Sequence, residues 1–254
     1  MNRTLKKALQ ILAVSAFWLG LWGLAAFLVD KPLLLPYPWV VIRRLGELLL
    51  TAECYAATLR SLCNVLLGIL IALLLGILLA VLTHRFRGVR LLLLPLMTVI
   101  KTTPIVSFII LAILWIGSGG VPSFITVLIV LPIVWSNLDT GLSAVDGTLL
   151  EMTHVYRMPL GARIRHLILP SVMPYFLSAC RASIGLAWKA GIAAEVIAVP
   201  LATIGAMLSD AKQYLEAVDM FAWTLLVILL SLLLEAICSR LLSRLAGARR
   251  KKEV

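Results

Sequence analysis

The sequence predicts an all-α polytopic membrane protein with about six transmembrane helices, and three observations support this fold class. Of the 254 residues, 62% are hydrophobic and 14% are charged, whereas about a quarter of the residues in an average soluble domain are charged. The mean hydropathy is +1.06. Uncharged runs recur along the chain, and most approach the roughly 20 residues that cross a bilayer as a helix.

The net charge of +11 suits two classes of partner, nucleic acid or membrane lipid. The Lys and Arg residues gather at the ends of the apolar runs, as they do at the cytoplasmic ends of membrane helices. We therefore expect contact with membrane lipid and none with nucleic acid. The four cysteines have no metal-ligand spacing, so we expect neither a metal site nor a disulfide framework.

The first apolar run, from about Ala8 to Val29, is expected to form the first span. Arg3, Lys6 and Lys7 precede it, as basic residues precede the core of a signal peptide. The run is longer than the apolar core of a cleaved signal peptide, which has about 7–15 residues. We interpret it as an uncleaved span with its N-terminus in the cytoplasm.

After Pro38 the spacing of apolar residues becomes helical. The apolar positions that share one face are Val41, Leu45, Leu48 and Leu49. Arg43 and Glu47 lie one turn apart on another face. The pattern predicts a short helix on the outer membrane surface, with Tyr37 and Trp39 at headgroup depth.

The second span is expected from about Ser61 to Thr83. Small residues recur along it at every fourth position, at Gly68, Ala72, Gly76 and Ala80. Small residues are common in membrane helices generally, but a run at this stride predicts a ridge where a second helix approaches closely.

From Leu91 to Leu138 the only charged residue is Lys101. The cluster Gly117-Ser118-Gly119-Gly120 interrupts this run, and glycine clusters disfavour helix. We therefore divide the run there into a third and a fourth span.

Within the third span, Lys101, Thr102, Thr103 and Pro104 place a charge, two hydroxyls and a helix breaker together, and Ser107 follows. Proline removes a backbone donor and frees a carbonyl one turn back. One interpretation is a helix break that faces a polar translocation path. The other is that Lys101 extends its ammonium group to the inner interface.

The fifth span is expected from about Leu167 to Pro200, and it contains Arg181, Lys189 and Glu195. Charges within a span are costly and usually face a bundle interior or a water-filled cavity. Arg181 and Lys189 lie about two turns apart and broadly share a face. These three residues either line the translocation path or serve the structure, Glu195 through an interhelical pair.

The last span is expected from about Met220 to Cys238. Positive residues then cluster in four places: the N-terminus, Arg85 to Arg90, the central loop, and the tail Arg249-Arg250-Lys251-Lys252. All four clusters agree with six spans and two cytoplasmic termini. The opposing residues, fewer in number, are Arg43, Arg44 and Arg60.

The central loop from Glu151 to Pro170 reads EMTHVYRMPLGARIRHLILP. Permease subunits of ATP-binding cassette (ABC) importers carry a loop signature of Glu-Ala-Ala, three residues, Gly, nine residues and Ile-x-Leu-Pro. The loop resembles this signature in register, because Glu151 stands at its Glu and Leu167-Ile168-Leu169-Pro170 stands at its end.

Four positions depart from the signature, and the smallest departure is Leu167 in place of Ile. Met152 and Thr153 replace the two alanines, and Arg157 stands where glycine is usual. Gly161 falls four positions too late to be that glycine. Outside the loop, three further segments resemble the branch that handles sulfonates, taurine, nitrate and thiamine precursors: Tyr37-Pro38, Asp139-Thr140-Gly141 and the tract from Pro174 to Glu195.

The resemblance implies the type I ABC importer permease fold, as a single transmembrane permease domain over residues 1–254. It implies a cytoplasmic coupling helix between spans 4 and 5, within a loop of about residues 140–170. The residues expected to contact the ATPase are Glu151, Met152, Thr153, Tyr156, Arg157, Pro159, Leu160, Gly161 and Pro170. The alternative for this loop is a merely solvated, positively charged segment.

The resemblance also implies partners in a prokaryotic inner membrane. They are two ATPase subunits, a second permease chain that most simply makes a homodimer, and an extracytoplasmic substrate-binding protein. The chain has no G-x-x-x-x-G-K-[ST] phosphate loop, so ATP and Mg²⁺ are expected on the ATPase and no cofactor on this chain.

Two other classes of function are the alternatives to an importer permease. A membrane-embedded enzyme needs a catalytic constellation, and the three histidines show no such spacing. An ion-coupled carrier more often shows an internal inverted repeat in a longer chain. We therefore expect a transport subunit that is not an enzyme, for a small anionic or heteroaromatic solute.

Overall fold

The structure is a computed structural model, and it describes residues 3–250. Within these residues every regular element is helical. The elements in chain order are α1 (Arg3–Val29), α2 (Pro38–Leu48), α3 (Ala52–Arg85), α4 (Arg87–Thr102), α5 (Ile105–Ser143), α6 (Gly147–Val155), α7 (Leu160–Arg163), the π-helix η1 (Ile164–Ile168), α8 (Leu169–Ala198), α9 (Ile204–Gln213) and α10 (Ala217–Arg250). The all-helical prediction is confirmed.

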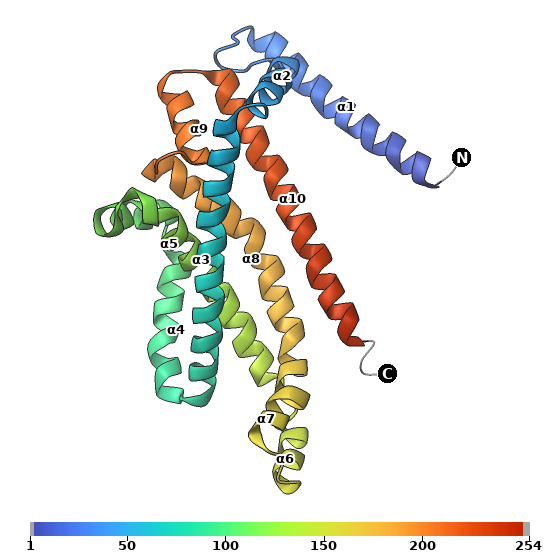
Figure 1. The fold of residues 1–254 in the computed structure, drawn as a ribbon, viewed down its shortest axis with the longest axis vertical. Coiled ribbons are helices and arrows are strands. Elements are labelled where there is room, and N and C mark those ends of the chain that lie inside the picture. Colours follow the sequence, from blue (N-terminus) through green and yellow to red (C-terminus); the bar gives the residue numbers. More distant parts are fainter. Residues whose placement is uncertain (1–2, 251–254) are drawn as a thin grey trace.

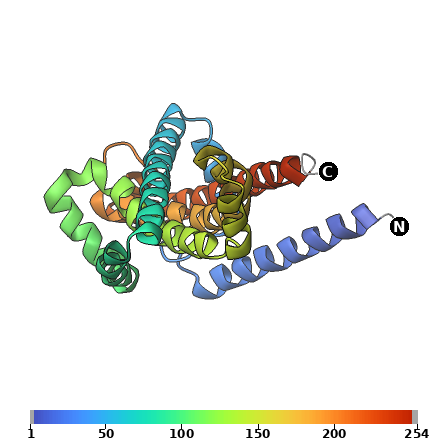
Figure 2. The same cartoon turned by 90° about the horizontal axis from the view of Figure 1, so that it is seen from below.

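The long helices α3, α5 and α8 form the centre of the molecule, with α5 packed against both others. Helix α10 lies along α8, and α4 lies beside α3 (Figure 1). Helices α2 and α9 lie at one end, called here the α9 end, and α6 and α7 lie at the opposite end, called the coupling end. Helix α1 projects away from the bundle in both views (Figures 1 and 2).

The predicted ridge of small residues is confirmed, and its partner helix is α5. All four small residues are buried. A Cβ atom added to Gly68 would lie 2.6 Å from Cβ of Thr126, and one added to Gly76 would lie 2.6 Å from Cγ1 of Val134. Larger side chains would therefore separate the two backbones.

The predicted helix break within the third span is present. Within residues 3–250, five helices are long and apolar enough to cross a membrane. The expected third span is divided: α4 ends at Thr102, and α5 begins at Ile105, after Pro104. The cause is the expected one, because Pro104 cannot donate a backbone hydrogen bond to continue α4.

The expected division between the third and fourth spans is confirmed as a sharp bend inside α5. Gly117 has φ 70° and ψ 166°, a left-handed value that glycine adopts without steric cost. The residues before it and after it are both helical. The bend turns the short first part of α5 away from the long second part (Figure 1).

Two boundaries near the α9 end were predicted wrongly. Helix α3 begins at Ala52, not at about Ser61, because Thr51 caps it by accepting a hydrogen bond from the Cys54 amide (3.3 Å). Leu49 does not share the buried face of α2, because the helix ends at Leu48 and Leu49 is exposed.

The rest of the predicted apolar face of α2 is confirmed. Val41, Leu45 and Leu48 are buried. On the polar side, Arg43 Nε lies 3.2 Å from Glu47 Oε1. Tyr37 and Trp39 stack with ring centroids 4.5 Å apart.

All three arginines that opposed the orientation prediction have partners at this same end, and Arg43 pairs with Glu47 as described above. Arg44 donates to both carboxylate oxygens of Asp219 at 2.6 and 2.8 Å, and this contact raises its pKa. Arg60 donates to the Leu201 carbonyl at 3.0 Å. These contacts give the guanidinium groups of Arg44 and Arg60 a structural role.

The orientation prediction also drew on charges at the two ends of the chain. Lys251 and Lys252 lie outside the described residues, and so do the side chains of Arg3, Lys6, Lys7 and residues 249–250.

Candidate functional site

The predicted coupling segment forms a hairpin of short helices at the coupling end (Figure 1). Asp146 caps its first helix, α6, by accepting a hydrogen bond from the Thr148 amide at 2.8 Å. This bond to the ionised carboxylate lowers the pKa of Asp146 below its ordinary value. Helix α6 therefore begins at a strong cap, although it is only nine residues long.

The end of α6 explains why the loop signature has glycine at the position of Arg157. Arg157 has φ 48°, in the left-handed region. The Arg157 amide donates to the His154 carbonyl (3.0 Å), and the Met158 amide donates to the Thr153 carbonyl (2.9 Å). Such six-residue closure of a helix end uses one left-handed residue, usually glycine. Arg157 therefore retains the glycine conformation without being glycine.

The hairpin exposes apolar side chains. The coupling surface consists of Leu149, Met152, Val155, Tyr156 and Leu160, all exposed. Glu151 and Arg157 are exposed beside them, as are Pro159 and Gly161. Two of the predicted contact residues are less accessible: Thr153 is buried and donates to the Leu150 carbonyl (2.7 Å), and Pro170 is half-buried.

The hairpin joins α8 through the π-helix η1, at the closing element of the loop signature. The Leu169 amide bonds to the Ile164 carbonyl, five residues back. In an α-helix the amide of residue 170 would donate to the carbonyl of residue 166, but Pro170 has no N–H, and its ring crowds that carbonyl. A wider turn accommodates the proline, and Ser171 Oγ donates to the Leu167 carbonyl at 2.8 Å.

Close contacts root the hairpin in α5 and α8. A Cβ atom added to Gly141, on α5, would lie 3.0 Å from three atoms of Tyr175, on α8. Nearby, Arg90 at the start of α4 donates to Asp139 of α5 at 2.9 Å. The two helices that flank the hairpin are therefore packed against each other next to it.

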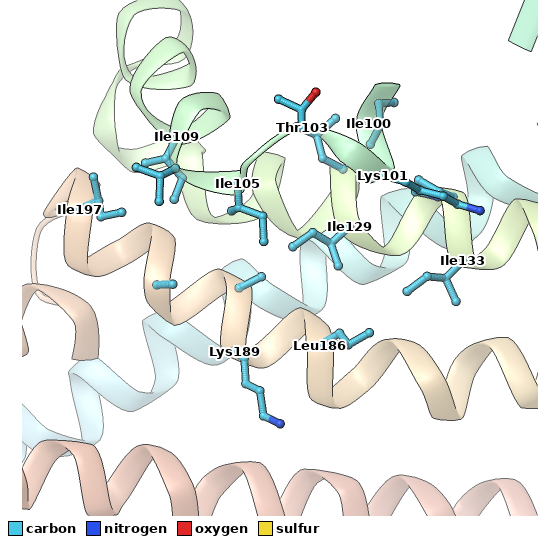
Figure 3. A pocket seen from close by; sticks show the side chains of 15 residues that line it. Ile100, Lys101, Thr103, Ile105, Ile109, Ile129, Ile133, Leu186, Lys189 and Ile197 are labelled. Carbon is cyan, nitrogen blue, oxygen red and sulfur yellow. The ribbon is translucent and has the colours of Figure 1, made fainter. Parts of the chain in front are cut away.

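A groove of about 580 Å³ lies beside the break between α4 and α5 (Figure 3). Lys101 and Thr103 line it from the break, and Lys189 lines it from α8. Three of the predicted path residues therefore meet at one groove, although they come from distant parts of the sequence.

The remaining predicted path residues do not line this groove. Thr102 bonds to the Thr98 carbonyl of its own helix (3.0 Å), and Ser107 lies exposed in the first turn of α5. Arg181 lines a separate cavity of about 410 Å³ with Glu235 of α10. These residues therefore have different surroundings.

Glu195 lies neither in the groove beside the break nor in the cavity of Arg181. It is fully buried and accepts hydrogen bonds from Ser61 Oγ (2.6 Å) and Asn64 Nδ2 (3.2 Å) of α3, and from the Gly205 amide (3.2 Å) of α9. The alternative that Glu195 makes an interhelical contact is therefore the one observed, with neutral donors as its partners.

Sequence reasoning missed two groups of polar residues. Ser61 and Asn64 bind Glu195, and their spacing of three residues inside an apolar run was the available signal. Glu235, within the last span, was the second omission. Among the described residues, no three His, Cys, Asp or Glu side chains come together as metal ligands.

A bundle of apolar helices, with a polar hairpin rooted in two of them and a groove beside a broken helix, defines a membrane transport permease. The chain belongs to the family of binding-protein-dependent transport system inner membrane components, whose model matches residues 72–251. It is a permease subunit of an ABC importer and has the type I importer permease fold.

Named relatives align with most of the chain. The putative aliphatic sulfonates transport permease protein of Bacillus subtilis is 27% identical, over 82% of this chain and 75% of that protein. The taurine transport system permease protein of Escherichia coli is 24% identical, over 84% and 80%. The bicarbonate transport system permease protein of Synechococcus elongatus is 26% identical, over 61% and 56%.

A solved structure supports the fold. It is the crystal structure of an amino acid ABC transporter with histidines, which matches with a TM-score of 0.59 at 17% identity. The match covers 75% of this chain and 91% of that one. The relatives are transport subunits, and this chain is likewise a transport subunit.

Proposed function

We propose that this chain forms half of a translocation pathway that a separate ATPase drives. The complete importer would contain two permease chains, most simply two copies of this one, two ATPase subunits and an extracytoplasmic substrate-binding protein. ATP and Mg²⁺ would bind to the ATPase, and this chain would bind no cofactor. The whole of residues 1–254 would serve as one permease domain.

The observation that carries the proposal is the coupling surface. Three of its apolar side chains lie on α6, a helix of nine residues that is too short to span a membrane, and Tyr156 and Leu160 lie just beyond it. Exposed apolar patches of this kind mark protein interaction sites. Because the hairpin is rooted in α5 and α8, a partner that moves it would move both helices as a rigid body.

We propose an orientation in the membrane from the position of the coupling surface. An ATPase binds nucleotide in the cytoplasm, so the coupling end would face the cytoplasm and the α9 end would face outward. Both termini would be cytoplasmic, in the inner membrane of a prokaryote. The four clusters of positive residues favour this orientation.

The solute class follows from the relatives and from the charges in the spans. The relatives' names refer to aliphatic sulfonates, taurine and bicarbonate, which are anions or carry an anionic group. Lys101 and Lys189 line the groove beside the helix break. We propose that the importer carries a small anionic solute, delivered by the binding protein.

The test is co-purification of the ATPase with a tagged permease. Val155→Asp places a charge in the middle of the coupling surface, where Val155 is 80% exposed. Leu50→Asp is the matched control, because Leu50 is 88% exposed at the α9 end. Burying an unpaired charge costs more than about 1.4 kcal/mol, so Val155→Asp should reduce bound ATPase by about tenfold or more.

Leu50→Asp should leave the bound ATPase unchanged. Equal retention of ATPase by both variants would exclude the coupling surface as the contact. Solute uptake by vesicles that contain this chain without any ATPase would contradict the proposal as a whole.

A further inference from the structure

Helix α4 is held to the rest of the molecule by few side chains. Of its 16 residues, only Met97 is buried. Along the chain, the single residue Phe86 joins α4 to α3, and the break at Pro104 separates it from α5. Apolar packing therefore holds α4 weakly, and one polar contact can decide whether it stays against α5.

That polar contact is the ion pair between Arg90 and Asp139. Arg90 lies in the first turn of α4, and Asp139 lies one turn before the end of α5. Arg90 Nη2 lies 2.9 Å from Asp139 Oδ2, and the carboxylate is largely buried while the guanidinium is half-exposed. A hydrogen bond between two ionised groups is stronger than one between neutral groups. The pair therefore holds α4 against α5 one turn beyond the Phe86 junction.

The carboxylate of Asp139 offers the guanidinium a second position. Its other oxygen, Oδ1, is buried and has no hydrogen-bond partner among the described residues. Both carboxylate oxygens can accept, and a guanidinium has five N–H donors. Arg90 can therefore move from one oxygen to the other, so that the contact survives a small shift of α4 along α5.

Asp139 belongs to the part of α5 that is fixed most firmly near the coupling hairpin. Trp135, one turn before it, donates to Thr83 Oγ1 of α3 at 3.1 Å. Gly141, two residues after it, packs closely against Tyr175 of α8. A movement of the hairpin that displaces α5 and α8 would therefore displace Asp139 with them.

We propose that Arg90 and Asp139 are a positioning pair, which makes α4 follow α5 when the ATPase moves the coupling hairpin. This inference rests on the proposed function and gives a role to two residues outside the coupling surface. Without the pair, α5 would move with the hairpin, and α4 would swing about its junction with α3 at Phe86.

The experiment measures whether α4 moves with the hairpin. The native cysteines are first replaced by alanine, at Cys54, Cys63, Cys180 and Cys238. Spin labels are then attached in pairs to new cysteines in the full chain, with a shared reference at Leu50, which is exposed at the α9 end. The second label is placed at Val99, exposed on α4, or at Gly147, exposed at the start of α6 and outside the coupling surface.

Electron paramagnetic resonance gives the distance between the labels in the complete importer, without nucleotide and after trapping with ATP and vanadate. The labelled chain is diluted with excess unlabelled chain, so that each complex carries at most one labelled copy. Trapping should change both the distance from Leu50 to Val99 and the distance from Leu50 to Gly147. Arg90→Gln should abolish the change at Val99 and retain the change at Gly147.

Two further variants separate the pair from a general effect of charge. Arg87→Gln is the matched control, because Arg87 is exposed at the start of α4 and belongs to none of the ion pairs of the described residues. It should leave both changes intact. Arg90→Lys should retain the change at Val99, because an ammonium group can supply the one hydrogen bond that the pair makes.

Four results would overturn the inference. They are a Val99 that stays in place in the chain with native Arg90, a Val99 that still moves in Arg90→Gln, a loss in Arg90→Gln that Arg90→Lys does not restore, and an equal loss in Arg87→Gln. If Arg90→Gln prevents assembly, Asp139→Asn takes its place, since it keeps one acceptor oxygen and the shape of the side chain. An undiminished change at Val99 in Asp139→Asn would equally overturn the inference.

The bound ATPase is measured in the same samples. A stationary Val99 beside a moving Gly147 would reject this inference alone. Loss of the ATPase from the chain with native Arg90 and Asp139, or a stationary Gly147 in that chain, would reject the proposed function.

Discussion

Glu195 shows at the scale of one residue how a buried carboxylate organises the α9 end. Its three partners, Ser61, Asn64 and the Gly205 amide, are all donors. Ser61 Oγ in turn accepts from the Ile204 amide at 3.0 Å. One side chain thus joins α3 and α8 to the first turn of α9 and satisfies amides that have no partner within that helix.

This arrangement predicts an order of stability for substitutions at Glu195. Glu195→Gln should be mild. The Gln amide oxygen can accept from Ser61 and Gly205, and its NH₂ group can donate to the side-chain oxygen of Asn64 once the Asn64 amide group flips. Glu195→Ala leaves three donors unsatisfied, at about 1–3 kcal/mol each for the buried ones. The measurement is the thermal unfolding temperature in detergent, with the exposed Glu216→Ala as control. Equal losses for Gln and Ala would show that the charge itself is required.

Substitutions at Arg157 can separate the role of its backbone conformation from that of its side chain. Its left-handed conformation closes α6, and a residue other than glycine pays about 1–2 kcal/mol there. Arg157→Gly should therefore keep the turn and slightly stabilise the hairpin, and Arg157→Ala should keep the strain. Hydrogen exchange of the α6 amides measures the turn, and co-purification of the ATPase measures the contact.

If the guanidinium contacts the ATPase, both variants should lose ATPase equally while only Arg157→Gly protects the amides better. If only the backbone matters, Arg157→Gly should retain the ATPase as well as the unaltered chain does. Weaker protection of α6 in Arg157→Gly than in Arg157→Ala would contradict this account of the turn.

At the scale of elements, η1 sets the direction in which the hairpin leaves α8. A π-turn holds one more residue than the α-turn that it replaces, and one residue corresponds to about 100° of rotation in an α-helix. The cause of this turn is Pro170, at the beginning of α8. The loop signature therefore fixes the orientation of the coupling surface as well as its composition.

Pro170→Ala should allow η1 to become regular α-helix and to rotate the hairpin relative to α8. We expect bound ATPase and ATP-driven uptake to fall together, by about tenfold or more, because the apolar contacts would be misaligned. Pro174→Ala is the matched control, since Pro174 lies one turn further along α8, beyond η1. Equal effects of the two substitutions would mean that η1 has no special role.

Some helix breaks and boundaries could be predicted from the sequence, and others could not. Pro104 and Gly117 act through their own backbones, so both breaks could be predicted from local rules. The start of α3 could not, because the hydrophobic run begins later than the helix, and only the Thr51 cap marks the true beginning. The loop signature aligned Arg157 with glycine, but its left-handed φ is visible only in the structure.

The groove could be predicted only in part. The helix break and the two lysines were visible as a proline and as charges in apolar runs. That Lys101 and Lys189 line one groove, while Arg181 and Glu235 line another cavity, depends on the packing of α5 against α8 and of α10 against α8. Such pairing of distant segments has no signal in a single sequence.

At the scale of the whole molecule, the coupling hairpin and the groove share two helices. The walls of the groove include Ile129 and Ile133 of α5 and Leu186 of α8, and the hairpin is rooted in the same helices. Lys101 belongs instead to α4, which is separated from α5 by the break at Thr103 and Pro104. A rigid movement of α5 and α8 would therefore change the groove only if this break bends.

Pro104→Ala tests whether the break acts as that hinge. Alanine restores an amide donor and favours a continuous helix from α4 into α5. We expect ATP hydrolysis by the complete importer to continue while uptake falls by about tenfold or more, because the motion would no longer open the groove. Pro95→Ala is the matched control, since Pro95 lies inside α4 without breaking it. A parallel fall in hydrolysis and uptake would place Pro104 in assembly of the complex, and unchanged uptake would show that the groove opens without bending at this point.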